Sequence, residues 1–269
     1  MLQDLAHWPV DNVAGALIGP GGVTETFGDT ARAFALASVT KPLVASAVLV
    51  AVEEGAVELD TPAGPPGATV AHLLSHASGL AFDSREQIAP VASQRIYSSA
   101  GFEVLAETVE QATGIAFPDY LTAAVAEPLG MSTTTLDGPA GHGATSCVDD
   151  LARYAHDLLR PRLVAPETAR SARSVWFPGL DGFVPGYGRH RPCDWGLGFE
   201  IRGHKSPHWT GTRNSPRTFG HFGQTGTFLW VDPARELSLV VLTARDFDEW
   251  AKPLWPALSD EVLREFGPD

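Results

Sequence analysis

A serine and a lysine lie three residues apart in the segment Ala-Ser-Val-Thr-Lys-Pro, as Ser38 and Lys41. Residues i and i+3 share one face of a helix, so the hydroxyl and the amine can meet. The stretch 43–52 that follows is apolar on every side, which predicts a buried helix and a lysine without hydration. Burial and the positive end of the helix dipole favour the neutral amine, and a neutral lysine beside a serine is a general base. We interpret Ser38 and Lys41 as nucleophile and base.

Pro42 fixes where this helix starts, because proline is tolerated in a first turn but not in a helix interior. The helix should begin near Ser38, where free backbone N–H groups can hold an oxyanion, and end at Gly55 in a left-handed conformation. The alternative is that Ser38 is a plain N-cap and Lys41 extends to solvent. The chain has only three lysines, and this one stands beside its most apolar helix, which favours the catalytic interpretation.

Composition limits the possible partners. The chain has 269 residues, is 44% apolar, and carries 32 acidic against 19 basic side chains, a net charge of −13. This balance argues against binding to nucleic acid or to anionic membrane surfaces.

Cys147 and Cys193 are far apart and lack metal-ligand spacing, so we expect free thiols. No secretory signal or membrane-spanning stretch is recognised, and we expect a cytoplasmic protein.

Predicted strands lie at both ends of the chain and predicted helices in the middle. The strands are 12–19 and 22–28, which form a hairpin, followed much later by 218–223, 227–232 and 237–243. The helices are 69–76, 99–112, 116–127 and 148–159, with a closing helix at 247–266. Residues 179–216, rich in Gly, Pro, Trp and His, are expected to form long ordered loops.

This order predicts an α/β (α+β) fold, in which one antiparallel sheet built from both termini is flanked by helices. A mostly helical lobe is inserted into it. We expect residues 1–269 to form one unit, with an α/β lobe at 1–60 plus about 200–269 and a helical lobe at about 61–199. A pocket between the two lobes is the natural place for a site.

Three short motifs together resemble those of the serine β-lactamase and penicillin-binding protein superfamily, in particular class C β-lactamases and family VIII esterases. They are Ser38-Val39-Thr40-Lys41, Tyr97-Ser98-Ser99 and His221-Phe222-Gly223. The segments LLSHASGL at 73–80 and EPLGM at 127–131 are also typical of this superfamily. The resemblance extends over about residues 12–260 and implies a β-lactamase/transpeptidase-like fold.

The resemblance also implies roles for these residues. Ser38 is expected to form an acyl-enzyme, with Lys41 and Tyr97 as the acid/base pair and Tyr97 acting as phenolate or proton shuttle. The backbone N–H groups of Ser38 and Gln224 would form the oxyanion hole, a contribution of about 10²–10³ in rate per donor. The remaining substrate-binding positions are His221, Gly223 and Ser99. No metal and no organic cofactor are expected.

Three departures from the superfamily pattern bear on the substrate. Ser99 replaces an asparagine that normally holds an acyl-side amide, and His221 replaces the usual lysine. Phe222 removes a threonine hydroxyl that helps to bind a substrate carboxylate. These changes weaken recognition of β-lactams and D-Ala-D-Ala peptides, unless residues just upstream (Arg213, Asn214 or Arg217) compensate. The late aromatic residues Trp195, Trp209, Phe228 and Trp230 either line an apolar acyl pocket or pack in the core.

The sequence therefore predicts a serine hydrolase that cleaves small carboxylic esters, with a small-molecule ester or amide as its partner. The alternatives within the same fold are a β-lactamase, a D-amino-acid peptidase or an acyltransferase. From a different class, a catalytically silent binding module remains open, since the asparagine is lost. A Ser-His-Asp hydrolase is disfavoured, because the chain contains no Gly-x-Ser-x-Gly motif. The sequence gives no indication of oligomeric state.

Overall fold

Strands from the two ends of the chain lie side by side in one antiparallel sheet, in the computed structural model that describes residues 1–266. The strand order is β2-β1-β11-β10-β9-β8. The strands are β1 (Val13–Gly19), β2 (Gly22–Phe27), β8 (Glu200–Ile201), β9 (Phe219–Gly223), β10 (Thr227–Asp232) and β11 (Leu237–Thr243). Strand β1 pairs with β11 over residues 13–18. This arrangement confirms the predicted fold class.

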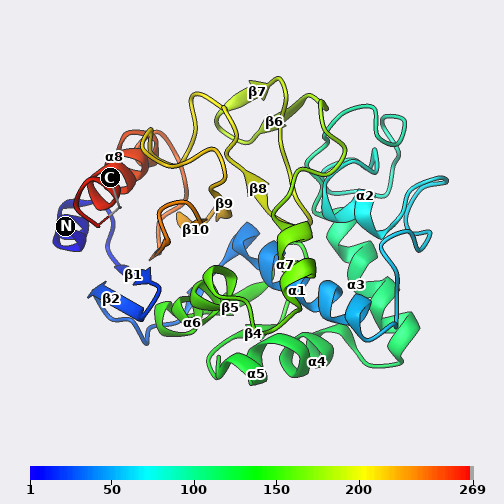
Figure 1. The fold of residues 1–269 in the computed structure, drawn as a ribbon, viewed down its shortest axis with the longest axis horizontal. Coiled ribbons are helices and arrows are strands. Elements are labelled where there is room, and N and C mark those ends of the chain that lie inside the picture. The colour runs from blue at the N-terminus through cyan, green and yellow to red at the C-terminus, as the bar shows by residue number, and fades with distance from the viewer. Residues whose placement is uncertain (267–269) are drawn as a thin grey trace.

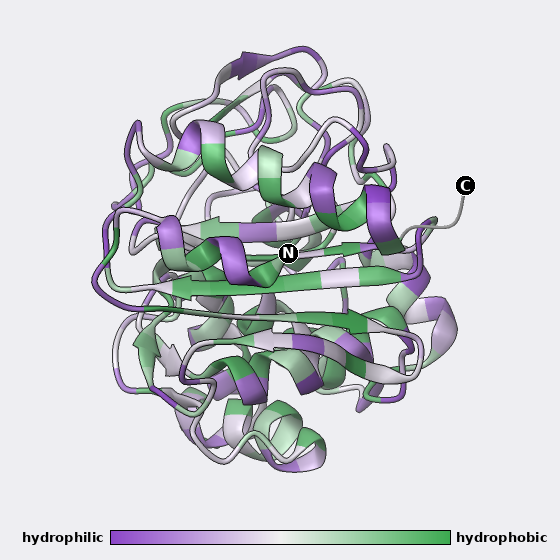
Figure 2. Ribbon diagram, turned by 90° about the vertical axis from the view of Figure 1, so that its left-hand side faces the viewer, coloured by the Kyte–Doolittle hydropathy of each residue, from purple (hydrophilic) through white to green (hydrophobic). Residues whose placement is uncertain are grey.

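The central strands of the sheet are buried on both faces, and alternate residues of these strands enter two different hydrophobic clusters. Trp230 and Val241 point to one face, whereas their neighbours Leu229 and Val240 point to the other. This alternation follows from the two-residue period of a strand. Figure 2 shows the strands as a mainly apolar layer with helices above and below it.

Each face is covered by helices from a different part of the chain. On one face lie α1 (Thr40–Glu53) and α6 (Val148–Leu159), with α6 in contact with β1, β10 and β11. On the other lie α8 (Ala251–Phe266) and the short 3₁₀ helix η1 (Leu2–His7), so the first helix and the last share one cluster (Figure 1). We predicted the closing helix from residue 247, but it begins four residues later.

The remaining helices lie between β2 and β8 in the chain, as predicted. They are α2 (Val70–Leu74), α3 (Ala100–Thr113), α4 (Phe117–Leu121), the π-helical turn η3 (Thr122–Ala126), α5 (Glu127–Leu129) and α7 (Pro166–Ala172). The predicted helix 116–127 is thus present as a continuous helical segment, with a π-helical turn between α4 and α5. The division of the chain into two lobes stays a prediction.

Several short strands were not predicted. Strands β3 (Phe34–Ala35), β4 (Thr135–Leu136) and β5 (Ala144–Ser146) form a small sheet, and β6 (Gly182–Val184) pairs with β7 (Gly188–His190). The segment 179–216, predicted as loops, therefore contains β6, β7 and β8. Strands of two or three residues are too short to show a period.

Cys147 and Cys193 are both free and buried. Among residues 1–266, no helix is long and apolar enough to cross a bilayer.

Candidate active site

Ser38 lies in the short 3₁₀ turn η2 (Ala37–Val39), directly before α1. The predicted helix start is therefore correct to within two residues. Pro42 is the third residue of α1, where proline is tolerated, and Gly55 just beyond the helix has a φ of +75°. The side chain of Lys41 has no exposed surface. The predicted burial of this lysine is confirmed.

Two threonines near the start of β10 hold the backbone that leads into the turn of Ser38. The hydroxyl of Thr225 donates to the carbonyl of Ala35 at 2.7 Å, and that of Thr227 donates to the carbonyl of Leu36 at 2.9 Å. Ala37, just before the serine, has a φ of +45°, a conformation that non-glycine residues rarely adopt. Such a conformation persists only where the surroundings impose it. The sheet thus fixes the backbone next to Ser38.

Three oxygens surround the amine of Lys41. Its Nζ lies 2.8 Å from the carbonyl oxygen of Gly141, 3.1 Å from the hydroxyl of Ser99 and 3.4 Å from the hydroxyl of Ser38. A neutral amine has two hydrogens and one lone pair. When the hydrogens point to Gly141 and Ser99, the lone pair faces Ser38, which is the arrangement a general base requires.

Burial also favours the neutral amine of Lys41, which is the form that can accept a proton. It lowers the pKa of Lys41 from 10.5 to about 7, and the carboxylate of Glu103 counteracts part of this shift. A base works best when its pKa lies near the working pH. The site therefore presents a lysine that gains and loses a proton near neutral pH.

Tyr97 lies beside both the amine of Lys41 and the hydroxyl of Ser38. The Nζ of Lys41 lies 4.6 Å from the centre of the Tyr97 ring, and the Tyr97 hydroxyl is hydrogen-bonded to the side chain of Ser38. Burial raises the pKa of Tyr97 well above its usual value, so the hydroxyl keeps its proton at neutral pH. Of the two roles expected for Tyr97, this favours the proton shuttle over the phenolate.

His221 lies on β9, opposite Leu229 of β10, on the face of the sheet that α1 covers. Its Nδ1 donates to the carbonyl of Phe222 at 2.6 Å, which leaves Nε2 to accept from the Tyr97 hydroxyl at 3.5 Å. Burial, with a smaller effect of Lys41, lowers the pKa of His221 to about 3. At neutral pH His221 is therefore an uncharged imidazole.

Gly223 lets the end of β9 approach the nucleophile. A Cβ at this position would lie 2.3 Å from the carbonyl oxygen of Leu36 and 2.5 Å from the hydroxyl oxygen of Thr227. Only glycine fits this contact. Gln224, the next residue, is thereby brought beside the turn of Ser38, and both line the same cavity.

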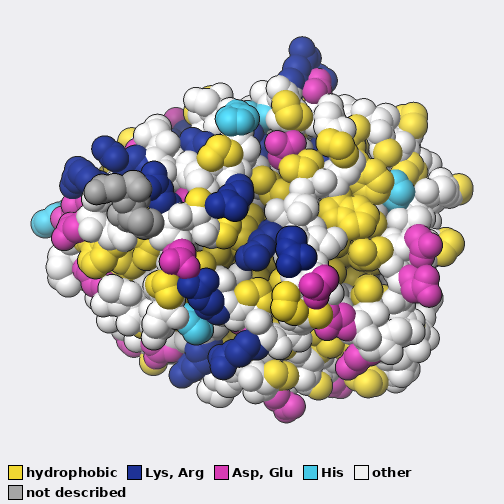
Figure 3. Space-filling view, in the orientation of Figure 1, with side chains coloured by type: hydrophobic (Ala, Val, Ile, Leu, Met, Phe, Trp, Pro, Cys, Tyr) yellow, Lys and Arg dark blue, Asp and Glu magenta, His cyan; other side chains and the backbone are white. Residues whose placement is uncertain are grey.

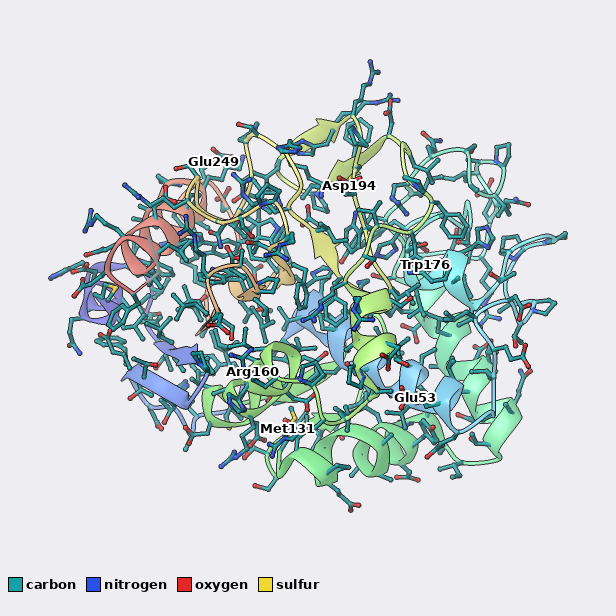
Figure 4. All side chains as sticks on the ribbon, viewed as in Figure 1. Glu53, Met131, Arg160, Trp176, Asp194 and Glu249 are labelled. Carbon is teal, nitrogen blue, oxygen red and sulfur yellow. The ribbon has the colours of Figure 1, made fainter. Side chains whose placement is uncertain are left out.

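This cavity, of about 340 Å³, is mostly apolar. It is lined by Ser38, Phe82, Tyr97, Val184, Pro185, Trp195, Glu200, His221, Phe222 and Gln224. Phe82, which is 54% exposed, stacks against Tyr97 at the rim. Trp195 follows Asp194, which Figure 4 labels in the loop before β8. A separate, mostly apolar hollow of about 510 Å³ is lined by Trp176 and not by Ser38. Figure 4 labels Trp176, and Figure 3 shows apolar side chains gathered on that part of the surface.

Among the described residues that line the cavity, Glu200 is the one charged side chain. Its carboxylate is 3.3 Å from the amine of Lys205, 3.1 Å from His208 Nε2, and accepts from the Trp209 indole at 2.6 Å. Burial alone would raise the pKa of Glu200, but Lys205 and His208 outweigh it and hold the pKa well below its usual range. A substrate carboxylate would thus meet a neutral His221, while the charge of Glu200 is already paired with Lys205.

The upstream residues proposed as compensation do not line the cavity: Arg213, Asn214 and Arg217 all lie outside it. Asn214 is buried and accepts from the backbone of Gly211. Of the four late aromatic residues, Trp195 lines the cavity. Trp209, Phe228 and Trp230 belong to the core cluster under α8.

The sequence did not reveal Phe82, Val184, Pro185 and Glu200 of the cavity lining, nor three residues that support the site from outside it. Gly141 comes from the loop after β4, and Glu103 accepts hydrogen bonds from the backbone of that loop. Arg95, buried two residues before Tyr97, donates to the carbonyls of Ser75, Trp176, Phe177 and Cys193. Gly141 contributes only its backbone carbonyl, and Glu103 and Arg95 bind backbone groups that lie far away in the sequence. Such contacts produce no recognisable spacing of residue types.

Comparison with known protein families shows to which family the chain belongs. The family model described as beta-lactamase matches residues 29–263 of the chain. The chain belongs to the beta-lactamase family. The site just described thus belongs to a beta-lactamase-family serine hydrolase with α/β architecture.

Relatives of this beta-lactamase-family chain include proteins described by different activities. Esterase EstB of Burkholderia gladioli is 26% identical over 85% of the chain and 81% of its own length. A putative D-alanyl-D-alanine carboxypeptidase of Salmonella enteritidis is 38% identical, but over only 27% of the chain and 18% of its own length.

Among solved structures, one described as a beta-lactamase from Mycobacterium bovis is 63% identical, with a TM-score of 0.98 over 99% of both chains. EstCE1, described as a hydrolase with promiscuous acyltransferase activity, has a TM-score of 0.78 over 96% of this chain and 95% of its own. At 18% identity, EstCE1 supports the fold alone.

Proposed function

We propose that the protein is an esterase that cleaves small, uncharged carboxylic esters through an acyl-Ser38 intermediate. A single observation supports the choice of substrate: the cavity beside Ser38 has a mostly apolar lining, and no lysine or arginine is among the described residues that line it. β-Lactams and D-Ala-D-Ala peptides carry a carboxylate that needs such a cation. An uncharged ester has no such requirement, and its apolar groups fit the walls formed by Phe82, Val184 and Trp195.

The reaction begins when Ser38 Oγ attacks the ester carbonyl carbon and Lys41 takes the serine proton. The resulting oxyanion is held by the backbone N–H groups of Ser38 and Gln224. When the bond to the leaving group breaks, Tyr97 gives its proton to the departing alkoxide and regains one from the Lys41 ammonium. Water then attacks the acyl carbon, and the same two residues move the proton in the opposite direction to release the acid and free Ser38.

The test is covalent labelling combined with paired substrates. Wild type, Ser38→Ala and the surface control Ser174→Ala are treated with a fluorophosphonate and measured by intact mass. We expect one label on wild type and on the control, and none on Ser38→Ala. The nucleophile assignment fails if Ser38→Ala labels as wild type does. A wild type that does not label at all would support the catalytically silent binding module.

Substrate class is tested with a nitrophenyl butyrate and a chromogenic cephalosporin side by side. We expect the neutral ester to have the higher kcat/KM, because it needs no cation in the cavity. The second candidate, a β-lactamase, is favoured by the Mycobacterium bovis structure of that description at 63% identity. A higher kcat/KM for the cephalosporin would replace our assignment with that one. Transfer of the acyl group to an added alcohol instead of water would show an acyltransferase.

A cytoplasmic location and a lack of nucleic-acid or membrane partners stay predictions from charge and composition. Fractionation of the native host with an antibody to the protein tests the location.

A further inference from the structure

The carboxylate of Glu103 clamps the loop between β4 and β5. Its Oε1 accepts from the backbone N–H of Gly141 at 2.7 Å, and its Oε2 accepts from that of Ala140 at 3.0 Å. Both oxygens are therefore used to hold two consecutive amides. Hydrogen bonds to an ionised acceptor are among the stronger ones in proteins.

The clamped residue is the one that contacts the catalytic lysine. The carbonyl oxygen of Gly141 accepts from Lys41 Nζ at 2.8 Å, the shortest of the three contacts of that amine. A Cβ on Gly141 would lie 2.8 Å from the Cβ of Ser99, so the close approach of this loop requires glycine. Glu103 thus sets the position of the group that orients Lys41.

The orientation matters because Lys41 must direct its lone pair at Ser38. With Gly141 and Ser99 taking the two hydrogens of the neutral amine, the lone pair remains for Ser38. A looser Gly141 carbonyl would let the amine rotate. The longest contact, that to Ser38 at 3.4 Å, is the one that would be lost.

The charges around Lys41 support the same role for Glu103. The titratable groups facing Lys41 are Tyr97, His76, His221 and Glu103. Burial keeps Tyr97 protonated and lowers the pKa values of His76 and His221, so these three are uncharged at neutral pH. Glu103 supplies the opposing charge when Lys41 accepts the serine proton and becomes an ammonium in a dry site.

We propose that Glu103 is a positioning residue of the active site, which aims Lys41 at Ser38 by holding the Gly141 carbonyl and stabilises the ammonium formed there. This inference rests on the proposed roles of Ser38 and Lys41. Glu103 itself touches neither the nucleophile nor the substrate cavity.

The test is the rate of fluorophosphonate labelling of Ser38 between pH 5 and pH 9, in wild type and Glu103→Gln. The glutamine removes the charge and one acceptor. We expect labelling at pH 8 to slow roughly tenfold to a hundredfold, as misplacement of a catalytic group does. We also expect the midpoint of the rising limb to move to lower pH, because loss of the nearby negative charge lowers the pKa of Lys41.

Two variants separate this role from a structural one. Glu107→Gln, one turn further along α3, removes an exposed carboxylate paired with Arg85 and should label as wild type does. Glu103→Asp keeps the charge with a shorter reach and should slow labelling without moving the midpoint. An unmoved midpoint in Glu103→Gln, or an equal shift in Glu103→Asp, overturns the proposal. Failure of wild type itself to label would instead overturn the roles of Ser38 and Lys41.

Discussion

The hydroxyl of Tyr97 and Nε2 of His221 lie 3.5 Å apart, and the other ring nitrogen of His221 donates to the carbonyl of Phe222. That second bond fixes the tautomer, so Nε2 can only accept. The Tyr97 proton is therefore shared between an imidazole and the Ser38 hydroxyl, its other partner. A histidine in place of a lysine leaves this part of the site polar but uncharged.

Removal of the tyrosine hydroxyl should slow the reaction without disturbing the fold. Tyr97→Phe keeps the ring contacts with His76 and Trp195, at centroid distances of 4.7 Å and 6.0 Å, but cannot carry a proton. We expect kcat for a nitrophenyl ester to fall by about 10²–10⁴. The matched control is Tyr187→Phe, because the buried Tyr187 hydroxyl has no hydrogen-bond partner among the described residues. Equal rates in the two variants would remove Tyr97 from the mechanism.

Loss of the lysine amine should have a comparable effect. Lys41→Ala removes the base that accepts the Ser38 proton, and we expect kcat/KM to fall at least ~10². Lys252→Ala, at a partly exposed lysine paired with Glu249, is the control and should retain activity. Thermal unfolding of both variants distinguishes loss of the base from loss of the fold. A folded Lys41→Ala enzyme with near-normal kcat/KM contradicts the assignment.

Activity should rise with pH through about 7, the pKa of Lys41 in its buried site. The sign follows from the role: Lys41 must be deprotonated to accept the serine proton, so kcat/KM falls as pH drops below that value. His221, with a pKa near 3, stays neutral over the range of the assay and adds no second limb. The measurement is kcat/KM for a neutral ester from pH 5 to pH 9. A profile that falls with rising pH across neutrality would require a protonated lysine.

Addition of one methyl group at the end of β9 should damage both stability and activity. In Gly223→Ala the new Cβ would meet the carbonyl of Leu36 at 2.3 Å, which forces the strand away from the turn of Ser38. We expect a loss of about 1–3 kcal/mol in the free energy of unfolding, as overpacking typically causes. Slower labelling of Ser38 should accompany it. Gly21→Ala is the control, since a Cβ there meets nothing within 4 Å; equal stability of the two variants would contradict the close contact.

The sequence by itself determined the longer elements and the pair of residues that we propose as nucleophile and base. Two short, mostly apolar runs joined by a turn marked β10 and β11, and the apolar run after Pro42 marked α1 with its buried lysine. These predictions succeeded because strand and helix periods, and the position of proline, are local properties. The motifs at Ser38, Tyr97 and His221 marked residues that line one cavity.

Only the tertiary structure decided what surrounds that pair. Gly141 is separated from Lys41 by 100 positions and His221 from Tyr97 by 124, so no local pattern links them. The uncharged state of His221 and the pKa of Lys41 near 7 come from burial among residues of several elements. Desolvation depends on everything packed around a group, and a sequence specifies that packing only through the complete fold.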